Sequence, residues 1–147
     1  METPKKIAMV TEVVIWITLV CAAAVYVAIP WLVDSYLFRN FSNRAATFAA
    51  LYVGGAGAIW LVIEFLRLMR TVVRGTPFVY ANVRSLRHIG VCCMICSAAI
   101  IFMLFFDFSV TLLICVGILL FGLLCSAVLA ALWKKAVDYK QENDLTI

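Results

Sequence analysis

The chain has 147 residues, of which 66% are hydrophobic and 14% are charged, and its formal net charge at pH 7 is +4. Its mean hydropathy of +1.09 is far above that of a soluble globular domain, and a soluble fold of this size could not bury so much apolar surface. The length allows one domain, and the composition indicates that the lipid bilayer is its main solvent.

Four apolar runs follow one another along the chain. At about 1.5 Å per residue, a helix of about 20 residues crosses the roughly 30 Å hydrocarbon core of a bilayer. We predict spans at residues 7–33, 45–66, 86–106 and 110–133, within one domain of residues 1–147. These runs are apolar on every side, unlike the alternating strands of a membrane barrel. The predicted fold class is therefore all-α, an integral membrane four-helix antiparallel bundle.

The first run could be mistaken for a cleavable signal peptide. Lys5 and Lys6 give it a basic start, but the apolar stretch continues to Val33 and is too long for the core of a signal sequence. We expect it to be retained as a membrane span.

The cations are distributed unequally between the two sides of the predicted spans. Ten of the twelve Lys and Arg residues lie in the N-terminal segment, the connection 64–88 and the tail 134–147, and only Arg39 and Arg44 lie on the other side. The positive-inside rule predicts a multi-pass protein with both termini in the cytosol. Because this charge is a topology signal, we predict no direct binding of nucleic acid.

Three cations of the second connection are spaced to share a helix face. Arg67, Arg70 and Arg74 lie three and four residues apart. This strip suits anionic lipid headgroups, and its alternative role is to dock an acidic cytosolic partner.

The segment 75–78 predicts a turn followed by a helix. Gly75 permits a sharp reversal, Thr76 suits an N-cap, and Pro77 suits the first helical position. The third helix is therefore expected to begin near Pro77. Its first turns would bring further polar residues to the headgroups, namely Asn82, Arg84 and Arg87.

A family resemblance rests on the same segment. Gly75-Thr76-Pro77-Phe78, Asn82, Leu86-Arg87 and Ile89-Gly90, together with the ending 142–147, resemble a bacterial family of small four-span membrane proteins of unknown function. The resemblance implies a protein of the bacterial cytoplasmic (inner) membrane, associated in some members with a small helix-turn-helix regulator. It supplies no catalytic residues, because no activity is established for the family.

The tail ends in a short segment that includes Asp144, Leu145 and Thr146. One interpretation is an extended segment, 144–147, that adds to a partner or folds back on the turn 75–78. The alternative is a frayed, solvated end.

Thiols are the most suggestive groups in the predicted spans. His88, Cys92 and Cys96 form a helical stripe, with Cys93 beside it, and these groups could bind a metal or haem or act in thiol–disulfide exchange. No second cluster of Cys or His supplies ligands from another segment. We therefore predict no metal and no cofactor.

Two carboxylates lie at the ends of spans. Glu64 is three residues from Arg67 and can pair with it, and Glu12 could reach Arg70 or Arg87. Glu12 and Glu64 form a candidate ion-pair or proton site. A carboxylate at mid-membrane would indicate ion-coupled transport, and the sequence places none there.

Small residues recur at every fourth position in two spans, which lets helices approach closely in lipid. They are Ala50, Gly54 and Ala58 in the second span and Gly122, Ser126 and Ala130 in the fourth. Packing inside the bundle and a homodimer seam both explain them.

The functional expectation follows from the absence of a catalytic signature and from the motif-like segments on one side. We expect a non-enzymatic regulatory or scaffold protein whose cytosolic face meets a soluble partner. The alternative is a small transporter or exporter subunit, and the third candidate is a thiol- or metal-binding membrane protein.

Overall fold

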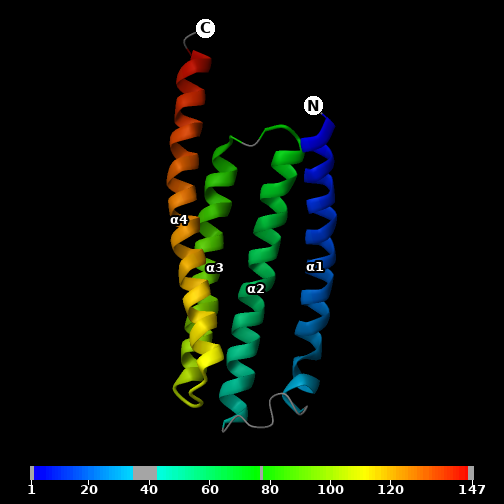
Figure 1. Ribbon diagram of the computed structural model, residues 1–147, viewed down its shortest axis with the longest axis vertical. Helices are drawn as coiled ribbons and strands as arrows, with labels where there is room; N and C mark the ends of the chain where they lie inside the picture. The colour runs from blue at the N-terminus through cyan, green and yellow to red at the C-terminus, as the bar shows by residue number, and fades with distance from the viewer. Residues whose placement is uncertain (1, 35–42, 77, 146–147) are drawn as a thin grey trace.

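The computed structural model describes residues 2–34, 43–76 and 78–145. These residues form four helices and no strand: α1 (Glu2–Asp34), α2 (Arg44–Val73), α3 (Tyr80–Leu104) and α4 (Val110–Leu145) (Figure 1). All four are long and apolar enough to cross a membrane. The predicted all-α fold with four membrane-crossing helices is confirmed, although α2 and α4 continue past the predicted spans into charged sequence.

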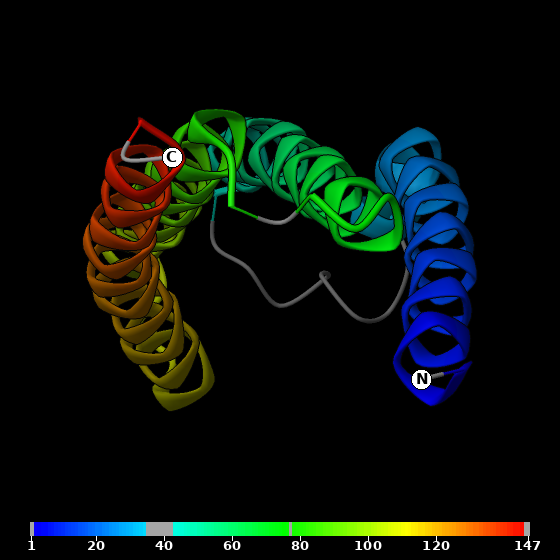
Figure 2. The same ribbon diagram turned by 90° about the horizontal axis from the view of Figure 1, so that it is seen from above.

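The helices form an open row. α1 packs on α2, α2 on α3, and α3 on α4, and no other pair of helices is in contact within the described parts of the chain. Figure 2 shows the row from above as an open curve, with α1 and α4 at its two ends. Neighbouring helices are antiparallel, as predicted, but the first and last helices do not close the bundle.

The best-packed part of the row lies between α2, α3 and α4. The buried residues Leu68, Leu86, Ile89, Cys93 and Ala130 form one cluster there. Of the most apolar stretch of each helix, 44% is buried inside the protein in α3, 22% in α2, 11% in α4 and 6% in α1. The two outer helices therefore expose most of their apolar surface, which the bilayer can cover.

Small residues set the spacing of the central helices. A Cβ at Gly90 of α3 would lie 2.8 Å from Ser126 Oγ of α4, and one at Gly57 of α2 would lie 2.9 Å from Cys96 Sγ of α3. Ser126 and Ala130 are buried, which agrees with the packing interpretation for the fourth span. In the second span Ala50 is buried and Ala58 is exposed. The homodimer seam remains a prediction.

An apolar groove lies on the inner side of the curve. Its volume is about 720 Å³, and residues from all four helices line it, including Tyr26, Gly55, Cys96 and Leu119. It exists because α1 and α4 do not meet.

The turn after α2 corrects one prediction. Gly75 has a φ of 74°, as its role in a sharp reversal requires. The Gly75 N–H donates to Val72 O at 3.0 Å, and the Thr76 N–H donates to Thr71 O at 3.1 Å. This pair of bonds is a Schellman motif, so Thr76 closes α2 and does not cap α3.

The third helix begins later than predicted. It starts at Tyr80, and Val79 is its N-cap residue with no side-chain capping bond. The expected start near Pro77 is wrong, because the residues after the turn contact α4 before the chain becomes helical. Pro77 itself lies outside the described residues.

The tail prediction also needs correction. α4 is one continuous helix to Leu145, so Asp144 and Leu145 are helical and exposed, not extended and not folded back on the turn. Thr146 and Ile147 lie outside the described residues. Mixed charges and good helix-forming residues let the helix continue after the apolar run ends.

Candidate functional site

We call the end of the molecule that holds Gly75 and the C-terminal part of α4 the charged end. The N-terminus and the C-terminus both lie there (Figure 1). Its cations come from every helix, and those whose side chains the structure describes are Lys6, Arg67, Arg70, Arg74, Arg84, Arg87, Lys134, Lys135 and Lys140.

Glu64 is the centre of a polar cluster at this end. Its side chain is 1% exposed. One carboxylate oxygen, Oε1, accepts hydrogen bonds from Trp60 Nε1 at 3.2 Å and from Arg67 Nη1 at 3.0 Å. Trp60 is four residues before Glu64 and Arg67 is three after it, so one face of α2 supplies all three groups. The predicted pair of Glu64 with Arg67 is confirmed.

The next helix adds a fourth member to this cluster. His88 Nδ1 of α3 lies 3.0 Å from the same Glu64 oxygen. Because an ionised carboxylate only accepts, Nδ1 must carry a proton to bond it. The second oxygen, Oε2, is buried and has no hydrogen-bond partner among the described residues. Glu64 thus gathers side chains of α2 and α3 around a single buried carboxylate.

A cleft of about 370 Å³ opens beside this cluster, between α2 and α3. Cations from both helices line it, and Glu64 is the one carboxylate among its lining residues. The full lining is Glu64, Arg67, Arg70, Thr71, Arg74, Ala81, Asn82, Arg84, Ser85 and His88. The cleft can therefore receive an anionic group.

Helix α1 braces one wall of the cleft. Glu12 Oε1 lies 3.5 Å from Arg70 Nε. The Arg70 guanidinium also lies over the Trp16 ring, 5.6 Å from its centroid. Of the two cations that Glu12 was expected to reach, it pairs with Arg70. Glu12 and Glu64 thus belong to two separate ion pairs, both at the charged end.

Two polar residues that line the cleft, Thr71 and Asn82, tie α2 to α3. Asn82, which is 1% exposed, donates from Nδ2 to Thr71 Oγ1 at 2.7 Å, and Thr71 donates to Leu68 O at 2.7 Å. These bonds join the last turns of α2 to the first turn of α3. Asn82, singled out in the sequence for a headgroup role, is a buried link between helices.

The turn after α2 also reaches α4. Phe78 packs on Trp133, with 5.8 Å between ring centroids. The Tyr80 hydroxyl donates a short hydrogen bond to Asp138 Oδ1. Phe78 and Tyr80 therefore connect the start of α3 to the C-terminal part of α4.

The thiols do not gather around His88. That ring is turned to Glu64, whereas Cys92, Cys93 and Cys96 are buried and free, and Cys96 donates to Gly54 O at 3.4 Å. In the described ranges, no group of three or more His, Cys, Asp or Glu residues could hold a metal. Cys96 acts here as a packing and hydrogen-bonding group between α2 and α3.

Several residues of the cluster did not stand out in the sequence. Trp60 could have been found from its four-residue spacing to Glu64. Ser85 needed the pairing of α2 with α3, and so did the contact of His88 with Glu64. Arg84 was expected near the headgroups, and the structure places it in the lining of the cleft. Arg87, which was expected near the headgroups together with Asn82 and Arg84, is exposed and does not line the cleft.

These features define a multi-pass α-helical membrane protein with a buried carboxylate beneath an arginine-lined cleft. The chain belongs to the family described as "Protein of unknown function (DUF2975)", whose profile matches residues 41–147. This agrees with the predicted membership of an uncharacterised family. The matched range includes α2, α3, α4 and the cleft, and α1 precedes it. No curated protein and no solved structure matches the chain.

Proposed function

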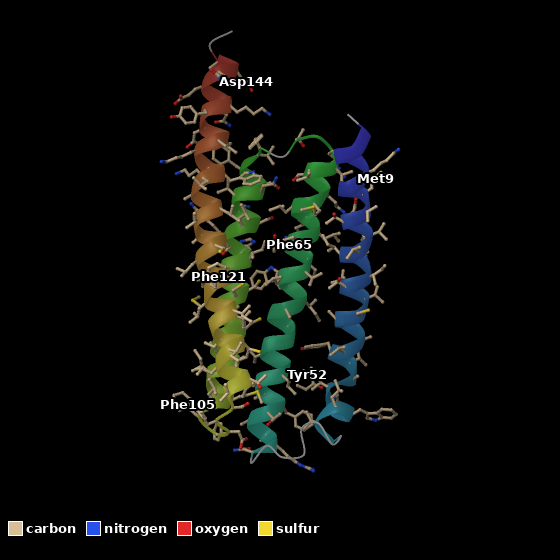
Figure 3. All side chains as sticks on the ribbon, in the orientation of Figure 1. Met9, Tyr52, Phe65, Phe105, Phe121 and Asp144 are labelled. Atoms are coloured by element: carbon tan, nitrogen blue, oxygen red, sulfur yellow. The ribbon has the colours of Figure 1, made fainter. Side chains whose placement is uncertain are left out.

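We propose that this chain is a non-enzymatic regulatory or scaffold protein that presents its charged end to a soluble partner in the cytosol. One observation carries the proposal: α4 continues as a helix past its last apolar turn and stands beyond the other helices (Figure 3). We call residues 134–145 the α4 extension. At 1.5 Å per residue it adds about 18 Å to the helix.

The surface of the α4 extension suits a protein partner. It carries Lys134, Lys135 and Lys140 among acidic residues, so neither sign dominates. Tyr139 is 69% exposed and Leu145 is 87% exposed. Exposed aromatic and apolar groups within a mixed-charge strip are typical of protein interfaces, whereas a lipid surface favours cations alone.

The α4 extension is coupled to the membrane-crossing part. Trp133 contacts Phe78, and Asp138 accepts the Tyr80 hydrogen bond. These contacts come from the end of the connection between α2 and α3 and from the first residue of α3. A partner on the α4 extension would therefore be linked to the packing of α2 and α3, as a regulatory protein requires.

The orientation and the partner complete the proposal. The excess of cations at the charged end supports a cytosolic location for both termini in a bacterial cytoplasmic membrane. A small helix-turn-helix regulator is the kind of partner that the family resemblance implies.

Photo-crosslinking in cells tests the proposal. A photoreactive residue replaces Tyr139 in one variant and Phe121 in a matched control, since these side chains of α4 are 69% and 68% exposed. We expect a soluble protein to be captured at Tyr139 and not at Phe121. Capture of the same proteins at both positions, or of none at Tyr139, would contradict a partner on the α4 extension.

A small transporter is the second candidate, and burial of Glu64 favours it, because its side chain is 1% exposed at the end of a membrane-crossing apolar run, and a buried carboxylate can serve as a proton or ion site. In sealed vesicles, this function predicts substrate flux that falls with Glu64→Gln and persists with Glu12→Gln. Equal flux in the two variants would show that Glu64 has no specific role in transport.

A further inference from the structure

We infer that the cleft between α2 and α3 binds the phosphate group of an anionic phospholipid. The binding groups are the side chains of Arg67, Arg70, Arg74 and Arg84, with His88 at the base. Lipid binding at this site requires no protein partner on the α4 extension.

The balance of charge in the cleft is the first argument. Four guanidinium groups from two helices line about 370 Å³, and Glu64 is the single carboxylate among the lining residues. Like charges repel more strongly in a cleft with low-dielectric walls than in open water. A bound anion removes this repulsion, and arginine forks match phosphate oxygens in geometry.

The second argument is that two of the four arginines, Arg67 and Arg70, are held in place by neighbouring side chains. Glu64 bonds Arg67 through a single terminal nitrogen at 3.0 Å, and Glu12 bonds Arg70 through Nε at 3.5 Å. Both pairs leave other guanidinium N–H groups for a ligand. The Trp16 ring further limits the motion of Arg70. Side chains that are already oriented lose less entropy when they bind.

The position of the cleft along α2 favours the phosphate of a lipid over a dissolved phosphate. The cleft extends from Glu64, where the apolar run of α2 ends, to Arg74, the C-cap residue of that helix. This boundary between apolar and charged sequence is where lipid phosphates lie. Trp60, which bonds Glu64, and Trp16 are 40% and 44% exposed, and tryptophan is enriched at this depth.

Arg87 is a control that distinguishes binding in the cleft from general attraction of anionic lipid to a charged surface. It lies three residues after Arg84 on α3 and is exposed, yet it does not line the cleft. Replacing either arginine removes the same charge from the same end of the protein. Only the loss of Arg84 should weaken a site in the cleft.

Native mass spectrometry of the full chain in detergent tests the inference. Phosphatidylglycerol is compared with phosphatidylcholine of the same acyl chains. We expect the native protein to retain phosphatidylglycerol preferentially. Arg84→Gln should lower this retention about fivefold and Arg74→Gln with Arg84→Gln by more, whereas Arg87→Gln should change it less than twofold. Arg84→Lys, which keeps the charge and loses the fork, should give an intermediate value.

Three results would overturn the inference. Equal retention of the two lipids would exclude a headgroup site, and equal losses with Arg84→Gln and Arg87→Gln would indicate surface attraction only. Displacement of phosphatidylglycerol by millimolar inorganic phosphate would assign the cleft to a soluble phosphate compound. Circular dichroism of each variant confirms folding, and because Arg84 is exposed, its single variant supplies the result if the double variant unfolds.

Discussion

α3 has 44% of its most apolar stretch buried inside the protein, whereas α1 has 6%. α3 contacts a helix on each side, and its buried face holds Asn82 and three cysteines. Among the described residues, α1 contacts only α2. The difference indicates that α2, α3 and α4 form the structural unit of the protein and that α1 is a peripheral helix.

Side-chain contacts near both ends of α1 hold it to that unit. At the charged end, Arg70 of α2 meets Glu12 and Trp16. Toward the other end, the rings of Tyr26 and Tyr52 meet edge to face, with centroids 5.4 Å apart. The family profile, which starts at residue 41, follows the same division. Four predictions, ordered by the size of the expected effect, test this contrast.

The largest effect is expected at Glu64, inside the unit. Glu64→Ala leaves Trp60 and His88 without their shared acceptor, and it should lower the free energy of unfolding in detergent by about 2–3 kcal/mol. Glu12→Ala, which removes a carboxylate that is 25% exposed, should cost about 0.5 kcal/mol. Thermal unfolding, followed by circular dichroism, measures the stability of both variants. Similar losses of stability would contradict the view that α2, α3 and α4 form a stable unit to which α1 is peripheral.

The helix contact at Gly90 should give the next effect. Gly90→Ala places a Cβ 2.8 Å from Ser126 Oγ and should destabilise the protein by about 1–2 kcal/mol. Gly117 of α4 has no atom within 4 Å of the corresponding position, so Gly117→Ala should be neutral or stabilising by up to about 1 kcal/mol. Adding Ser126→Ala should recover most of the Gly90→Ala loss. If Ser126→Ala does not restore stability, the contact between residues 90 and 126 does not determine the distance between α3 and α4.

A smaller and local effect is expected at Phe78. Phe78→Ala removes the ring contact with Trp133 and should cost about 1 kcal/mol. Amide hydrogen exchange in residues 134–145 should become faster. Phe121→Ala, on the exposed apolar part of α4, should leave exchange in that segment unchanged. Faster exchange in both variants would show that the Phe78–Trp133 contact does not specifically stabilise residues 134–145.

The smallest effect is expected at Trp16. Trp16→Leu removes the ring beneath Arg70 and should cost about 0.5–1 kcal/mol. Trp31→Leu, at a side chain that is 87% exposed, serves as the control and should change stability less. If the unfolding midpoints of the two variants shift equally, the contact between Arg70 and Trp16 does not stabilise the packing of α1 on α2.

Interactions within one helix were accessible from the sequence, because helical spacing is regular. The pair of Glu64 and Arg67 follows from a separation of three residues. The left-handed conformation of Gly75 was equally accessible, since glycine adopts it without strain. The start of α3 was not, because Thr76 could cap either helix and its N–H is committed to Thr71 of α2.

Contacts between helices could not be derived in the same way. His88 and Glu64 are 24 residues apart, and their meeting depends on the relative height of α2 and α3. That height is set by the turn at Gly75 and by close contacts such as Gly57 with Cys96. The sequence therefore suggested His88 as a partner of cysteines on its own helix, and the structure pairs it with a carboxylate on another.

The sequence by itself determined the number of membrane-crossing helices, their antiparallel order and the gathering of cations at one end, because bilayer thickness and charge asymmetry act on each segment separately. Only the tertiary structure decided that the helices form an open row, that Glu64 is buried under His88, and that arginines of two helices share a cleft. Those features depend on side-chain packing across helix pairs, which hydropathy and spacing along a single helix do not encode.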